Sequence, residues 1–95
     1  MTNVRWTAAA LADLDQILAY TEANYPALKP SVEIRIRAVI ERVARLPRSA
    51  RRVGQHSDIR VVPVLRYPFR IFYRVIGDGI EILHIHHTSR ELGIG

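Results

Sequence analysis

Three histidines gather near the end of the chain, in the stretch EILHIHHTSRE at residues 81 to 91. Imidazole exchanges a proton near neutral pH and is also a common metal ligand, so this stretch could do acid–base chemistry or bind a metal. His84 and His86 have the spacing that puts two side chains on one face of a β-strand. A third ligand would have to come from His56 or Asp58, and no second motif supports it. The sequence therefore predicts no metal site and no cofactor.

The same histidines raise the possibility of RNA cleavage. Attack by a 2′-hydroxyl needs a group that takes its proton, a group that protonates the leaving oxygen, and cations that carry the phosphorane charge. His87 or His86 could move protons, and Arg70 and Arg90 could hold the phosphate, with Arg60 as a further cation. No general base stands out, however. The plainer interpretation is that the histidines cap a strand end, with their imidazoles hydrogen-bonded to neighbouring groups.

These side chains must be positioned by β-rich runs in the second half of the chain. The runs are DIRVVPVL at 58–65, FRIFYRVI at 69–76 and IEILHIHH at 80–87. The sequence GDG between the last two is a strong signal for a tight hairpin, so we expect an antiparallel meander. Pro63 has no N–H to donate, which predicts that its strand lies at an edge or carries a bulge there.

Strict alternation along the last run would divide its side chains between two faces. Residues 80, 82, 84 and 86 would share one face, and residues 81, 83, 85 and 87 the other. His84 and His87 would then lie on opposite faces unless the strand bulges.

Two amphipathic helices precede the meander. Thr7 is a good N-cap for AAALADLDQILAYTEAN, and Ser31 for SVEIRIRAVIERVARL, with a short connector from Pro26 to Pro30. A strand at 4–6 comes first, so the predicted order is β-α-α-β-β-β. We expect an α+β fold in which a helical hairpin packs on a small twisted antiparallel sheet.

Length and composition limit the classes of protein. The chain has 95 residues and no cysteine, which predicts one domain spanning 1–95 without disulfides or thiolate zinc sites. Its first residues contain no long apolar run, so we expect neither a signal peptide nor a membrane span, and a cytoplasmic location.

The formal net charge of +5 comes mostly from arginine, since Lys29 is the only lysine. Between residues 42 and 74 the many arginines face only one acidic residue, Asp58. Such a polycation favours an acidic partner, either nucleic acid or an acidic protein segment, with binding that weakens in salt. A merely solvated basic face is the plainer alternative.

Four local patterns occur together in this chain: VRWTAAALADLDQILAYTEANYP at the start, the loop LPRSARRVG, the hairpin YPFRIFYRVIGDGIEILHI and the ending HHTSRE. Together they resemble the ParE branch of the RelE/ParE toxins, the toxins of bacterial toxin–antitoxin pairs. The resemblance covers nearly the whole chain. It implies a small α/β toxin that is neutralised by an antitoxin whose C-terminal segment wraps around it.

The resemblance also implies a target, which is DNA gyrase for ParE-like members and messenger RNA in the ribosomal A site for RelE-like members. Arg70, His87 and Arg90 stand where RelE-type nucleases carry an arginine, a histidine and a second arginine. The chain departs from the nuclease pattern, because DIRVVPVL has no lysine and no aromatic residue follows Arg90.

A gyrase-binding toxin is therefore our first hypothesis, a ribosome-dependent endoribonuclease the second, and an inactive homologue that acts as an antitoxin-binding co-repressor the third. We expect an antitoxin of the ParD type, with an acidic, amphipathic segment that orders as it binds in a hetero-oligomer. Its predicted contacts are Ile36, Arg42, Arg45, Val61 and Val62. The predicted contacts with the target are Arg51, Arg52, Arg66, Arg70 and Arg90.

Overall fold

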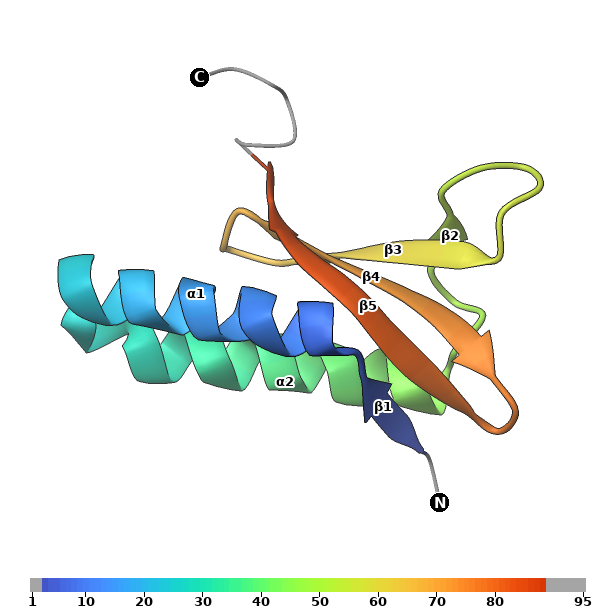
Figure 1. The fold of residues 1–95 in the computed structure, drawn as a ribbon, viewed down its shortest axis with the longest axis horizontal. Coiled ribbons are helices and arrows are strands. Elements are labelled where there is room, and N and C mark those ends of the chain that lie inside the picture. The colour runs from blue at the N-terminus through green and yellow to red at the C-terminus, as the bar shows by residue number, and fades with distance from the viewer. Residues whose placement is uncertain (1–2, 89–95) are drawn as a thin grey trace.

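The computed structural model describes residues 3–88 of the chain, and in them two helices cover one face of a five-stranded sheet (Figure 1). The elements are β1 (Val4–Trp6), α1 (Ala8–Asn24), the 3-10 turn η1 (Pro26–Leu28), α2 (Lys29–Arg45), β2 (Arg51–Arg52), β3 (Ile59–Val64), β4 (Phe69–Ile76) and β5 (Gly79–His87). The predicted α+β fold with a helical hairpin on a sheet is confirmed. Neither helix of the described residues is long and apolar enough to span a bilayer.

The sheet is mixed because its first strand runs parallel to its last. The strand order is β1-β5-β4-β3-β2, and Val4 lies opposite Ile80 in a parallel register. Parallel neighbours need a crossover connection, which the chain between β1 and β5 supplies. The remaining pairs form the expected antiparallel meander, extended by β2 within a segment that the sequence indicated as a loop.

The two helices begin differently. Thr7 is the predicted N-cap of α1, and its Oγ1 accepts a hydrogen bond of 3.1 Å from the Ala10 N–H. The prediction of Ser31 as the cap of α2 is wrong, because α2 begins at Lys29 without a side-chain cap. The turn η1 leads directly into α2, and Pro30 fits its first turn, where a missing N–H leaves no hydrogen bond unmade.

The core lies between the helices and the inner face of the sheet. The sheet contributes the fully buried Ile71, Tyr73, Ile80 and Ile82, against Ile36 from α2. Within residues 3–88, no helix lies on the opposite face of the sheet, which we call the outer face (Figure 1). It displays the alternate residues of β4, which are Arg70, Phe72 and Arg74.

A β-bulge in β5 changes which of its side chains meet the core. Phe72 pairs with His84 and Tyr73 with Ile82, so Leu83 is an extra residue. Strict alternation, as expected from the sequence, is therefore wrong across this point. Ile85 and His87 share the inner face with Ile82, whereas His84 and His86 share the outer face.

Pro63 lies in β3 opposite Arg70 of β4. Strand β3 as a whole is not an edge strand, because β2 pairs with Arg60 and Val61. At Pro63 itself, however, no described strand pairs with the other side of β3, so the predicted edge position holds locally and no ladder bond is lost where an N–H is missing.

Candidate functional site

The outer face of the sheet brings together basic, aromatic and histidine side chains in rows that cross the strands. One row runs from Arg51 through Val61 and Phe72 to His84. A second row contains Pro63, Arg70 and His86. A third contains Ile59, Arg74, Glu81 and Arg5. This face is uncovered among the described residues, so it is a candidate surface for binding another macromolecule.

One ion pair on the outer face joins neighbouring strands. Arg74 Nε donates to Glu81 Oε1 at 2.8 Å, so the positive charge of this arginine is compensated within the sheet. Arg51 is exposed and Arg70 is half-buried. The rings of Phe72 and His86 lie with centroids 5.0 Å apart, which gives the basic face an aromatic centre.

The residues expected for RNA cleavage lie on two different faces. Arg70 and His86 are cross-strand partners on the outer face. His87 is paired with Phe69 on the inner side, and their rings meet edge to face at 5.5 Å. Arg60 also faces inward, opposite Tyr73. Arg90 lies outside the described residues.

Arg60 holds the segment after α2 in place. Its Nη1 donates to the carbonyl oxygens of Ala50 at 2.6 Å and Arg48 at 3.2 Å. The adjacent Tyr73 hydroxyl donates to the Pro47 carbonyl at 2.8 Å. Burial raises the pKa of Tyr73 above its ordinary value of 10.0, and the positive charge of Arg60 opposes part of this rise. Arg60 therefore stabilises the segment after α2, on the opposite face of the sheet from Arg70.

The residues expected to meet the antitoxin also divide by burial. Arg42 and Arg45 are exposed in the last turn of α2. Ile36 is 0% exposed and Val62 is buried in the same core, so neither side chain offers a surface in this conformation. Val61 is buried on the outer face. A large apolar side chain that α2 does expose is Ile34, at 68%.

The arginines expected to meet the target occupy three places. Arg51 and Arg70 are on the outer face. Arg52 pairs with Arg60 and, with it, lines a shallow pocket on the inner side beyond α2. Arg66 is exposed in the turn between β3 and β4, where its φ is +78°. Arg90 again falls outside the described residues.

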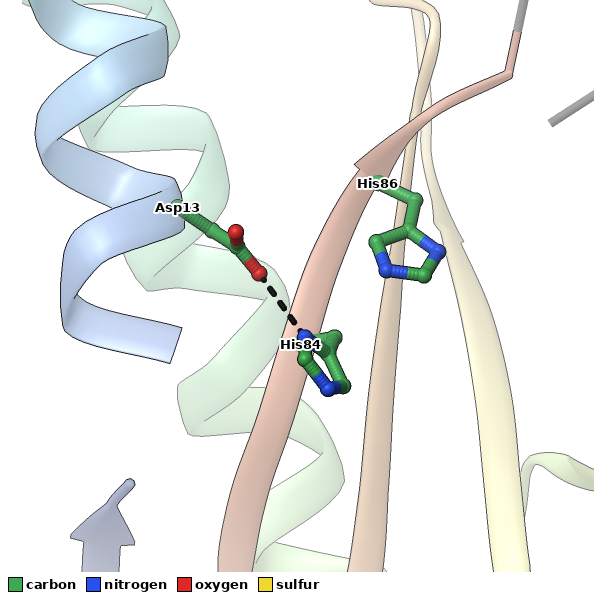
Figure 2. Close-up of side chains that lie close together, drawn as sticks. All are labelled: Asp13, His84 and His86. Carbon is green, nitrogen blue, oxygen red and sulfur yellow. Dashed lines mark hydrogen bonds and ion pairs between the residues drawn. The ribbon is translucent and has the colours of Figure 1, made fainter. Parts of the chain in front are cut away.

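Asp13 is a site residue that sequence reasoning missed. Its Oδ2 accepts from the Ile85 N–H at 3.0 Å and lies 3.2 Å from His84 Nδ1 (Figure 2). His56 and Asp58, the ligands considered from the sequence, line the inner pocket instead. The signal in the sequence was an acidic residue directly before the buried Leu14, on a helix whose apolar stripe faces the sheet.

A family model and a similar protein from another organism both match the chain. A family model described as the ParE toxin of the type II toxin–antitoxin system parDE matches residues 4–92. The chain is 34% identical over 89 residues to a Sinorhizobium fredii protein named "Putative toxin Y4kP", with 94% of this chain and 91% of that protein covered.

A solved structure also matches the chain in both fold and sequence. It is described as "Chromosomal ParDE TA system from P. aeruginosa" and matches with a TM-score of 0.77 at 27% identity. The match covers 92% of this chain and 96% of the other.

Proposed function

The chain belongs to the ParE toxin family of type II toxin–antitoxin systems, and we propose that it inhibits DNA gyrase by binding and is neutralised by a cognate antitoxin. The observation that carries this proposal is the family match over residues 4–92. Inhibition by binding requires no catalytic group on the toxin.

The arrangement of the polar residues supports binding rather than RNA cleavage. Proton transfer to and from a phosphodiester needs groups within hydrogen-bond reach of the same reacting atoms. Arg70 and His86 lie on the outer face, whereas Arg60 and His87 lie on the inner face. The sheet itself therefore separates members of the expected nuclease set.

The proposed antitoxin surface is the exposed side of α2. Ile34 and Arg45 stand about three helical turns apart on one side of α2, and Arg42 lies beside that line. An amphipathic acidic segment could place apolar side chains on Ile34 and carboxylates near the two arginines. The P. aeruginosa structure described as a ParDE system supports an antitoxin of the ParD type.

The proposal is tested with purified toxin and gyrase. We expect the toxin to inhibit supercoiling and to increase the amount of gyrase-cleaved DNA, and we expect the antitoxin to reverse both effects. If excess purified toxin leaves supercoiling unhindered, while cells that express the toxin still stop growing, gyrase is ruled out as the target.

Variants of the outer face locate the target contact. We expect Arg51→Glu and Arg70→Glu each to raise the toxin concentration for half-inhibition by about tenfold, because each places repulsive charge on the contact surface. Arg37→Glu makes the same charge change at an exposed position of α2 and serves as the control. Equal inhibition by all three variants would place the gyrase contact elsewhere.

RelE-like cleavage of messenger RNA is the second candidate function, and the pairing of Arg70 with His86 is the observation that favours it. Programmed ribosomes incubated with the toxin decide between the two candidates. Codon-phased cuts that are lost in His86→Gln would establish the nuclease. Harmless expression without antitoxin would instead favour an inactive co-repressor.

A further inference from the structure

Asp13, His84 and His86 form a cluster where α1 meets β5, with the two histidines on the outer face of the sheet. One ligand atom from each residue can be chosen so that all three lie within 4.8 Å of one another. Figure 2 shows Asp13 reaching from α1 to His84, with His86 farther along β5. We propose that these three residues bind one divalent transition-metal ion, with Zn²⁺ as the reference ion.

The donor set fits that class of ion. Two imidazoles and one carboxylate suit zinc and its neighbours among the transition metals, whereas calcium and magnesium prefer oxygen ligands alone. Three protein ligands leave one position of a tetrahedral ion open to water or to a partner.

The backbone brings the two histidines together. The bulge at Leu83 places both His84 and His86 on the outer face, and their ring centroids are 5.1 Å apart. His84 is exposed and His86 is half-buried. Their side chains can therefore turn toward a shared ion without a change in the core.

Asp13 is held in position before any ion arrives. The Ile85 N–H donates to its Oδ2, which fixes the carboxylate beside the edge of β5 that β1 no longer covers. A carboxylate has several lone pairs, so Asp13 can keep this bond and still coordinate an ion. The ion would replace the proton shared between Asp13 and His84.

The distances require only a small contraction. Ligands at about 2.0 to 2.1 Å from a tetrahedral zinc ion are separated from one another by about 3.3 Å. The upper limit of 4.8 Å in the cluster therefore has to shrink by about 1.5 Å. Rotations about the side-chain bonds of His84 and His86 can supply this.

One neighbouring charge acts against the ion. Arg70 stands across from His86 on β4, and its positive charge repels a cation at the cluster. The carboxylate of Asp13 acts in the opposite sense and is nearer, because it is itself a ligand. The bound ion would connect α1 to β5 and so stabilise the packing of the helix on the sheet.

The test is calorimetric titration of Zn²⁺ into the full-length chain prepared without a histidine tag. We expect one ion per chain with a Kd below about 10 µM at neutral pH, and a rise in melting temperature as the ion binds the folded state. Co²⁺ should give the intense visible absorption of a tetrahedral site. No saturable binding in this range, or no such absorption, would overturn the proposal.

Variants tie the ion to this cluster. We expect His84→Gln and His86→Gln each to weaken binding by about tenfold or more, and Asp13→Asn to weaken it while keeping an oxygen for the Ile85 N–H. His56→Gln removes an exposed histidine of the inner pocket and should leave binding unchanged.

Unchanged affinity in both His84→Gln and His86→Gln, with circular dichroism showing folded protein, would overturn the assignment. If either variant fails to fold, the Co²⁺ spectrum of the unaltered chain still decides whether the chain holds an ion in a tetrahedral site. The outcome is independent of gyrase inhibition, which is measured separately.

Discussion

At the scale of single residues, the buried phenol of Tyr73 links the central strand to the end of α2. Tyr73 is 0% exposed and its hydroxyl donates to the Pro47 carbonyl at 2.8 Å. Arg60 beside it bonds the carbonyls of the same segment. Together they fix the chain between α2 and β2, which carries Arg51 to the outer face.

The raised pKa of Tyr73 gives the first prediction. The unfolded chain releases this phenolic proton at about pH 10, and the folded chain releases it at higher pH. Above about pH 10 the unfolded state therefore binds fewer protons, so the free energy of unfolding falls as pH rises. Below that pH the contribution is fully present.

Tyr73→Phe should remove this alkaline loss and cost about 1 kcal/mol near pH 7, because the Pro47 carbonyl loses its donor. Urea unfolding of both proteins at about pH 8 and about pH 10.5 measures the difference. An identical pH dependence in the two proteins would contradict the prediction.

At the scale of elements, the pairing of β1 with β5 depends on a glycine. The Ile80 N–H donates to the Asn3 carbonyl at 2.9 Å. A Cβ at Gly79 would collide with that same carbonyl, whereas a Cβ at Gly54 would meet nothing within 4 Å. Close approach of two backbones thus requires the absence of a side chain at Gly79.

Gly79→Ala should lower the free energy of unfolding by about 1 to 3 kcal/mol, because β1 must move to make room. Gly54→Ala is the matched control and should change it by less than about 0.5 kcal/mol. Thermal unfolding of the three proteins measures both effects. Equal melting temperatures for the two variants would show that β1 adjusts at no cost.

The exposed end of α2 gives a prediction about the antitoxin. We expect Arg42→Glu combined with Arg45→Glu to weaken the antitoxin complex by about tenfold or more, because the two new glutamates would repel the carboxylates of the acidic antitoxin segment. Arg5→Glu makes the same charge change at an exposed position of β1, away from α2, and should have a much smaller effect. Affinity at low salt measures this, and an unchanged value for the double variant would place the antitoxin elsewhere.

Melting temperatures should accompany these affinities. Arg42 and Arg45 lie at the C-terminal end of α2, where positive charge is favourable to the helix dipole. Their reversal should cost about 1 kcal/mol or less per residue. A larger loss would mean that weaker binding reflects unfolding.

At the scale of the whole molecule, the two helices cover one face of the sheet, and in the part of the chain that the structure describes the other face is open to a partner (Figure 1). The net charge of +5 comes mainly from arginine, which keeps its charge at any physiological pH. Long-range attraction to an acidic partner therefore adds to the local contacts on the outer face and on α2.

The association rate with the antitoxin should accordingly fall as salt rises. Between about 0.1 M and about 1 M salt the screening length shortens from about 10 Å to about 3 Å, so steering is lost. We expect the rate to fall by about tenfold or more, while dissociation changes less. Surface plasmon resonance at several salt concentrations separates the two rates, and a salt-independent association rate would refute electrostatic steering.

Local signals were sufficient for most elements of the fold. The Thr7 cap, the Gly77 turn with its positive φ and the edge position of Pro63 all act within a few residues, so the sequence predicts them. The resemblance to the ParE branch also rested on such patterns, and the family match confirms it. The start of α2 was missed because η1 enters the helix before the expected cap.

The sequence by itself thus determined the helical hairpin, the meander, the excess of arginine and the family. Only the tertiary structure decided which residues meet. The bulge at Leu83 moved His84 and His86 to the outer face and His87 to the inner face, and packing brought Asp13 to a histidine 71 positions away. Strand faces and contacts between distant elements depend on register and packing, which no local pattern encodes.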